Sequence, residues 1–285
     1  MLITEQWAVA FITFSITFTG IITNLIVILA IRKASSMSGS FGIITSNQAV
    51  CNAVMCLIFL FYVFPVQISS SELLIDYSHY FGTAAMTVYE ISNGSHFLIA
   101  LNRFCALFLP HRYDKVFKNS TTIILRNVLW ICSMSCCSFF YEFLGCNFFY
   151  NPATWTFEFS STAYCSTLTW YSDFTFNTAA TVVTLIINLL AAYKERKNSR
   201  ILMDIAGIKK SVVQQKREWN FIKQTCFQGL SIFLGQFAYY IIAPIIGEFS
   251  SSFVCTGNTM GVYVGHGGWN NSGVKQRDSS GFQEK

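Results

Sequence analysis

Six apolar runs follow one another along the chain, and each exceeds the roughly 20 residues that a helix needs to cross a bilayer. The runs cover residues 7–31, 42–68, 80–109, 123–144, 172–193 and 221–248. The first run is longer than a signal-peptide core and has no basic residue ahead of it, so we interpret it as a retained span. The pattern predicts an all-α membrane protein in which residues 1–250 form a transmembrane helix bundle.

The basic residues are unevenly divided among the loops between these runs. Of the 19 Lys and Arg residues, two follow the first run, five surround the loop after the third run, and nine follow the fifth. The N-terminal segment and the loops after the second and fourth runs contain none. Because basic loops stay in the cytoplasm, the distribution predicts an N-terminus outside the cell.

Composition agrees with a membrane protein and argues against other classes. Hydrophobic residues make up 53% of the chain and charged residues only 12%, about half the usual share in soluble domains. The net charge of +5 does not indicate nucleic-acid binding, because the basic residues lie between apolar runs. No GxSxG, HExxH or P-loop occurs, and the four histidines are scattered. We therefore expect the lipid bilayer as a partner, and no enzyme activity, metal or cofactor.

The stretch LNRFCALFLPHRY, residues 101–113, places an arginine at the end of the third apolar run. A guanidinium group stays charged and is costly in hydrocarbon, so Arg103 must face a cavity or the interface. Pro110 then limits continuation of the helix into the loop. Two interpretations are open for Arg103: a contact that switches between partners, or an interfacial arginine that reaches out of the lipid. The residue taken alone favours the second.

The surrounding residues favour the first interpretation, because they resemble the D-R-Y-x-A-x-x-x-P-x-x-Y pattern of rhodopsin-like G-protein-coupled receptors. The residues in register are Asn102, Arg103, Phe104, Ala106, Pro110 and Tyr113. The chain is similar in sequence to the nematode serpentine chemoreceptors of class X over about residues 7–250. The most similar segments are SSMSGSFG, QAVCN, IALNRFCALF and FIKQTCFQ. The resemblance implies a seven-helix bundle, an external small-molecule ligand and a heterotrimeric G protein. It also implies the plasma membrane and a sensory cilium as the location.

The resemblance assigns expected roles to particular residues. The residues expected to act in G-protein coupling and receptor activation are Asn102, Arg103, Phe104 and Tyr113. Asn102 and Phe104 replace the acidic residue and the tyrosine that are usual at these positions. The residues expected to act in helix packing or as a hinge are Asn24, Asn52, Trp130 and Pro244. Asn52 stands where these receptors usually have an aspartate, so we do not expect a sodium site there.

Other candidates come from the residues themselves. Glu90 lies thirteen residues before Arg103, about 20 Å along the helix. Two interpretations of Glu90 are equally supported. Either it pairs with a ligand amine or with His96, or it is protonated and hydrogen-bonded to a neighbouring helix. Trp155 and Trp170, assigned here to the second outer loop, line a ligand entrance or form an interfacial belt. Glu142 and Asp173 are expected near the outer interface, in contact with solvent.

Of the ten cysteines, only Cys146 and Cys165 share a predicted outer loop. That compartment allows a disulfide between them, and the sequence leaves its formation open because spacing does not fix geometry.

The tail, residues 251–285, differs from the rest because it is rich in Gly, Ser and Asn and has no run able to span. Reading its codons one nucleotide later permits an apolar run ending in D-G-I-I-V-V-L-N-K-E-I, which resembles the end of a class X seventh helix. We therefore expect a frame change near residues 250–259. Two alternatives to a signalling receptor stay open: a small transporter or channel, and a truncated, non-signalling receptor product.

Overall fold

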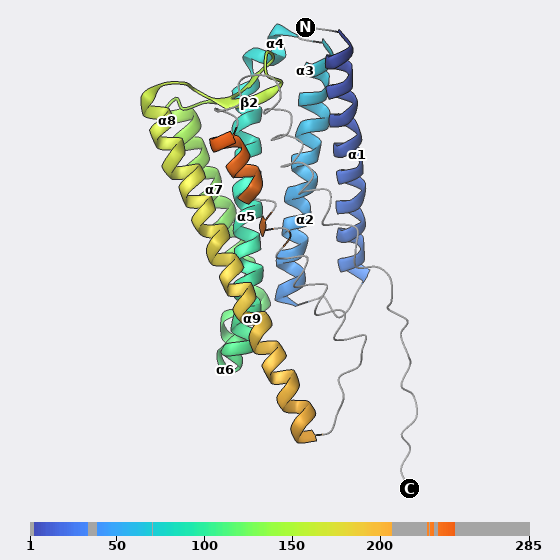
Figure 1. Ribbon diagram of the computed structural model, residues 1–285, viewed down its shortest axis with the longest axis vertical. Helices are drawn as coiled ribbons and strands as arrows, with labels where there is room; N and C mark the ends of the chain where they lie inside the picture. Colours follow the sequence, from blue (N-terminus) through green and yellow to red (C-terminus); the bar gives the residue numbers. More distant parts are fainter. Residues whose placement is uncertain are drawn as a thin grey trace.

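The computed structural model describes residues 3–33, 39–69, 71–206, 227, 229–230 and 233–242. Long helices lie side by side in these residues and form an elongated bundle (Figure 1). They are α1 (Ile3–Lys33), α2 (Ser40–Ile58), α5 (Ser78–Phe108), α7 (Asn119–Cys137) and α9 (Phe176–Ala206). The shorter helices α4 (Glu72–Asp76) and α6 (Pro110–Val116) connect them. Together with the helical turns that extend α2, α7 and α9, these helices account for the first five apolar runs of the sequence.

Three of the long helices contain a π-helical turn. The turn η2 (Phe59–Val63) joins α2 to α3 (Phe64–Ser69), and η3 (Ser138–Phe143) continues α7. The turn η4 (Trp170–Thr175) joins α8 (Ala163–Thr169) to α9. Pro65 accounts for the first of these turns, because proline has no N–H to donate to the preceding turn and forces the helix to widen.

Four helical segments of the described chain are long and apolar enough to cross a membrane. They are Gln6–Lys33, Ser40–Ser69, Asn119–Phe143 and Ala163–Asn198. Helix α5, the third expected span, has 31 residues but a more polar composition. Its buried side chains include Thr83, Ser92, Ser95 and Asn102, which are satisfied by neighbouring helices rather than by lipid. Helix α5 is therefore the central helix of the bundle.

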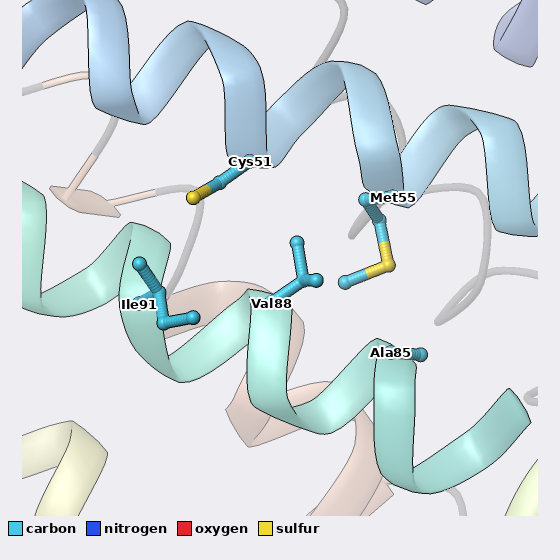
Figure 2. Packing of buried hydrophobic residues seen from close by; sticks show 5 residues of the cluster. All are labelled: Cys51, Met55, Ala85, Val88 and Ile91. Carbon is cyan, nitrogen blue, oxygen red and sulfur yellow. The ribbon is translucent and has the colours of Figure 1, made fainter. Parts of the chain in front are cut away.

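The apolar contact between α2 and α5 is built from small and medium side chains. Cys51 and Met55 of α2 pack against Ala85, Val88 and Ile91 of α5 (Figure 2). These residues recur every three or four positions, so they share one face of each helix. Small side chains let the two helices approach closely, which is how membrane helices gain packing energy without a hydrophobic driving force.

Hydrogen bonds complete the contact among α2, α5 and α7. The Ser92 hydroxyl donates to Asn52 Oδ1 over 3.0 Å. Asn47 Nδ2 donates to Ser95 Oγ over 2.9 Å, and its Oδ1 accepts from Trp130 Nε1 over 2.8 Å. Each such bond contributes about 1 kcal/mol within a membrane. Asn52 and Trp130 therefore lie at helix contacts, and buried Asn24 donates to the Gly20 carbonyl inside α1.

A β-hairpin crosses one end of the bundle, called here the hairpin end (Figure 1). Strands β1 (Phe148–Asn151) and β2 (Thr156–Phe159) are antiparallel, with Phe148 opposite Phe159. Tyr150 and Phe157 are buried against Tyr62 of η2. Burial raises the pKa of the Tyr150 hydroxyl above its ordinary value. The hairpin is therefore packed onto the helices rather than extended into solvent.

The sequence predicted that the fifth span starts at residue 172, and this prediction is wrong. The helix begins at Ala163, where the Thr162 hydroxyl accepts a hydrogen bond from Cys165 N over 3.2 Å and caps the first turn. Trp170 consequently lies in a helix and not in an outer loop. Hydropathy missed this segment because its sequence, AYCSTLT, is helical but not strongly apolar.

The sixth expected span, residues 221–248, is described only at residues 227, 229–230 and 233–242, which include η5 (Ala238–Ile242). Pro244 and the polar tail lie outside the described residues.

Gly82 is required where β1 crosses α5. A Cβ atom added at Gly82 would lie 1.7 Å from the Phe148 carbonyl oxygen, which belongs to the backbone and cannot rotate away. We expect Gly82→Ala to destabilise the protein by about 1–3 kcal/mol through overpacking. The measurement is the thermal unfolding midpoint of the purified protein. Gly39→Ala is the matched control, since nothing lies within 4 Å of its added Cβ, and equal midpoints for both variants would contradict the prediction.

Candidate functional site

Three polar side chains meet at the end of the bundle opposite the hairpin. Asn102 Nδ2 of α5 donates to Ser40 Oγ of α2 over 2.9 Å and lies 3.4 Å from Tyr113 Oη of α6. The Ser40 and Tyr113 hydroxyls are 3.1 Å apart. We call these three residues the Asn102 triad. The triad fastens α6 to the ends of both α2 and α5.

Local sequence brings Tyr113 to this position. Helix α5 ends at Phe108 with Leu109 as its C-cap, and Pro110 begins α6 at its first position, where the missing N–H leaves no bond unmade. The Tyr113 N–H donates to the Leu109 carbonyl over 3.0 Å. The resulting reversal turns α6 back toward the end of α2, so Pro110 determines where the tyrosine hydroxyl lies.

Arg103 and Phe104 lie beside the Asn102 triad without belonging to it. The Arg103 guanidinium carbon is 5.1 Å from the centroid of the Phe41 ring, within the range of a cation–π interaction. The Phe104 ring stacks on Phe108 at 4.5 Å. The neutral Asn102 amide donates to the Ser40 and Tyr113 hydroxyls, whereas a carboxylate at this position could only accept from them.

A second polar group lies closer to the hairpin end, between three helices. Asn177 Nδ2 of α9 donates to Glu90 Oε1 of α5 over 2.6 Å and to Asp173 Oδ1 of η4 over 2.8 Å. Tyr240 of η5 donates its hydroxyl to Asp173 Oδ2 over 2.5 Å. We call Glu90, Asp173, Asn177 and Tyr240 the Asn177 cluster.

Two expectations about these residues are wrong. Asp173 was expected in solvent, but its side chain is only 7% exposed and is hydrogen-bonded to Asn177 and Tyr240. His96 was one expected partner of Glu90, but its ring contacts the Gln48 side-chain amide on α2. The reason in both cases is helix rotation, which turns Asp173 inward and His96 toward α2. The spacing of Asp173 and Asn177, four residues apart, is the signal that places both on one helix face.

Two aromatic rings lie next to Tyr240 of the Asn177 cluster. The Trp170 and Phe174 ring centroids lie 6.0 Å and 5.0 Å from that of Tyr240. Trp155 instead lies between β1 and β2, where it packs on the cluster of Tyr62, Val66 and Tyr150 beneath the hairpin. The two tryptophans are therefore on different elements, and Trp170 is the one next to the Asn177 cluster.

Covalent and polar bonds hold the hairpin end together. A disulfide joins Cys146, just before β1, to Cys165 in α8, with Cα atoms 5.2 Å apart. Glu142 of η3, whose side chain is 29% exposed, accepts from Thr83 over 2.6 Å and contacts His79 Nδ1 over 3.0 Å. Within the described part of the chain, no group of three or more His, Cys, Asp and Glu side chains is arranged to hold a metal ion.

Long apolar helices around a polar central helix, with polar clusters at two depths, define a multi-pass helical membrane protein. The model of the family "Serpentine type 7TM GPCR chemoreceptor Srx" matches residues 14–264. The chain belongs to this family, which is one of chemoreceptors and not of enzymes.

Two proteins of Caenorhabditis elegans are similar to this chain. Serpentine receptor class X 45 is 26% identical over 243 residues, which are 82% of this chain and 66% of that protein. Serpentine receptor class X-43 is 27% identical over 227 residues, which are 78% of this chain and 68% of that protein. The chain thus spans about two thirds of the length of these curated relatives.

Tyr240 provides a test of the Asn177 cluster. We expect Tyr240→Phe to lower stability by about 1–3 kcal/mol, because the buried Asp173 carboxyl group would lose a donor. Thermal unfolding of the purified protein measures the loss. Tyr171→Phe, on the same π-helical turn as Asp173 but 65% exposed, is the control and should unfold at the wild-type midpoint. A Tyr240→Phe variant as stable as wild type would contradict the hydrogen bond.

Proposed function

We propose that this chain is a chemosensory receptor that binds an external small molecule and activates a cytosolic heterotrimeric G protein. Membership of the chemoreceptor family supports the general role. One observation supports the mechanism: α5 carries both Glu90 of the Asn177 cluster and Asn102 of the Asn102 triad. The two residues are twelve positions apart, about 18 Å along one helix.

The hairpin end faces the outside of the cell in this proposal. The distribution of Lys and Arg supports that orientation, since the loops at the opposite end carry the positive charge. The N-terminus is then outside, and the protein lies in the plasma membrane, including that of a sensory cilium. Ligand reaches the outer halves of the helices, among Glu90, Trp155 and Trp170, and the disulfide between Cys146 and Cys165 holds the hairpin above them.

The Asn102 triad is the inner latch of the receptor. While the triad is intact, α6 is fastened to α2 and α5, and Arg103 lies against Phe41. Ligand shifts the population toward a state in which the triad opens, so Arg103 and Tyr113 change partners and the inner loops contact the G protein. Phe104 and Phe108 keep the end of α5 packed in either state.

A small transporter or channel is the alternative function. Transporter folds tend to contain repeats with broken helices at corresponding positions, whereas the prolines here, at 65, 110, 152 and 244, show no such symmetry. Substrate uptake by the reconstituted protein would favour the transporter and contradict the receptor.

We also propose that the tail, residues 251–285, reflects a change of reading frame near residues 250–259. The family match ends at residue 264, which leaves residues 265–285 outside it. We expect a transcript sequenced through the codons for residues 245–285 to encode an apolar seventh span that ends in N-K-E-I. A transcript that encodes the tail as printed would instead favour a truncated, non-signalling receptor product.

Arg103 tests the proposed coupling. We expect Arg103→Ala to abolish G-protein activation and leave surface expression largely intact, because the guanidinium contacts the partner only in the active state. The measurement is nucleotide exchange on a co-expressed G protein, in membranes exposed to a panel of small amines, alcohols, acids and ketones. Arg126→Ala is the control, since that side chain bonds its neighbour Asn127, and it should signal like wild type. Undiminished signalling by Arg103→Ala would overturn this role.

A further inference from the structure

The Asn177 cluster contains two carboxyl groups inside membrane-spanning helices. Asp173 is 7% exposed, and Asn177 bridges it to Glu90 through both hydrogens of one amide group. Within the described part of the chain, the ion pair that the structure contains is His79–Glu142, and neither Glu90 nor Asp173 has a basic partner. Carboxylates in this setting are expensive unless positive charge compensates them, and an ionisable side chain within a membrane span is by default a candidate functional site.

Gln236 is an independent observation at the same place. Its side chain is 6% exposed, and its Oε1 accepts from the Thr178 hydroxyl over 3.2 Å. Its Nε2 has no hydrogen-bond partner among the described residues. Gln236 lies four residues before Tyr240, so both side chains share one helix face, and its side chain lies within reach of the hydroxyl of Tyr89, the residue before Glu90. A buried donor beside this cluster that lacks a well-aligned acceptor is costly, and it favours an acceptor supplied from outside.

The aromatic rings around Tyr240, which bonds Asp173, suit a cation as well. The Trp170, Phe174 and Tyr240 rings lie within 6.0 Å of one another, centroid to centroid. Aromatic faces attract organic ammonium groups, and they do so most strongly when the group has lost its water. Carboxylates and ring faces together discriminate an ammonium ion from a neutral molecule of the same shape.

We propose that the Asn177 cluster binds the ammonium group of a small organic amine between Glu90 and Asp173, and that Gln236 Nε2 donates to an oxygen acceptor of the same molecule. The proposal rests on the proposed function, and it adds the chemical class of the ligand. The ammonium group donates to carboxylate oxygens that now accept from Asn177 and Tyr240. Since Tyr240 belongs to η5 and Asp173 to η4, binding changes the contact between two helices at their π-helical turns.

The test uses the purified full-length receptor and needs no G protein. Thermal unfolding is measured with 2-methoxyethylamine, 2-methoxybenzylamine and 2-methoxycyclohexylamine at a pH where all are protonated, each against the alcohol with the same skeleton. We expect at least one amine to raise the unfolding midpoint by about 3 °C or more over its alcohol, because a ligand that binds the folded state alone stabilises it. If no amine stabilises more than its alcohol, the proposal is overturned.

Matched variants locate the effect. Glu90→Gln and Asp173→Asn keep the shape of each side chain and remove its charge, and we expect each to weaken the apparent affinity for the amine by about tenfold or more. Glu142→Gln removes a carboxylate that is paired with His79 at the hairpin end, and it should leave the affinity unchanged. An amine that stabilises Glu90→Gln and Asp173→Asn as well as it stabilises wild type overturns the proposal, as does equal weakening by Glu142→Gln.

The outcome separates this inference from the proposed function. Amine-specific stabilisation without nucleotide exchange on any G protein would support the site and contradict the coupling. Nucleotide exchange driven only by neutral or acidic members of the chemical panel would support the coupling and overturn the amine site.

Discussion

The structure depends on the need to satisfy the polar side chains of α5 inside a bundle that lipid surrounds. Neither hydrocarbon nor water supplies hydrogen-bond partners at this depth, so every neighbouring helix has to present one. Helix α2 presents Asn52 to Ser92, and α9 presents Asn177 to Glu90. The orientation of each helix about its own axis follows from these pairs, since a rotation of one residue step, about 100°, would separate the partners.

The two polar groups on α5 differ in charge, and this difference suits different tasks. The Asn102 triad is neutral, and each of its bonds can be exchanged for another neutral bond at low cost. The Asn177 cluster contains two carboxyl groups, for which the presence or absence of a cation changes the energy far more. The Asn177 cluster responds strongly to charge, and helix α5 joins it to the weakly held Asn102 triad at another depth. This arrangement is suited to transmitting a signal.

Packing at the hairpin end limits what reaches the Asn177 cluster. Phe157 and Tyr150 fill the space above η2, and the disulfide ties β1 to the helix that leads into η4. Because α8, η4 and α9 follow one another without a break, Cys165 and the turn that holds Asp173 belong to one continuous helix. The disulfide therefore links the hairpin to the helix that carries Asp173 and Asn177.

The sequence by itself determined the properties that can be counted along the chain. Apolar runs, the division of Lys and Arg among loops, and the register from Asn102 to Tyr113 indicated a helical membrane protein of the class X family, which the family match confirms. Only the tertiary structure decided which polar groups meet. Glu90 and Asn177 are 87 residues apart, and Asp173 and Tyr240 are 67 apart. Their contacts depend on how each helix is rotated, and the packing of side chains such as Cys51 against Ile91 fixes that rotation, which hydropathy does not record.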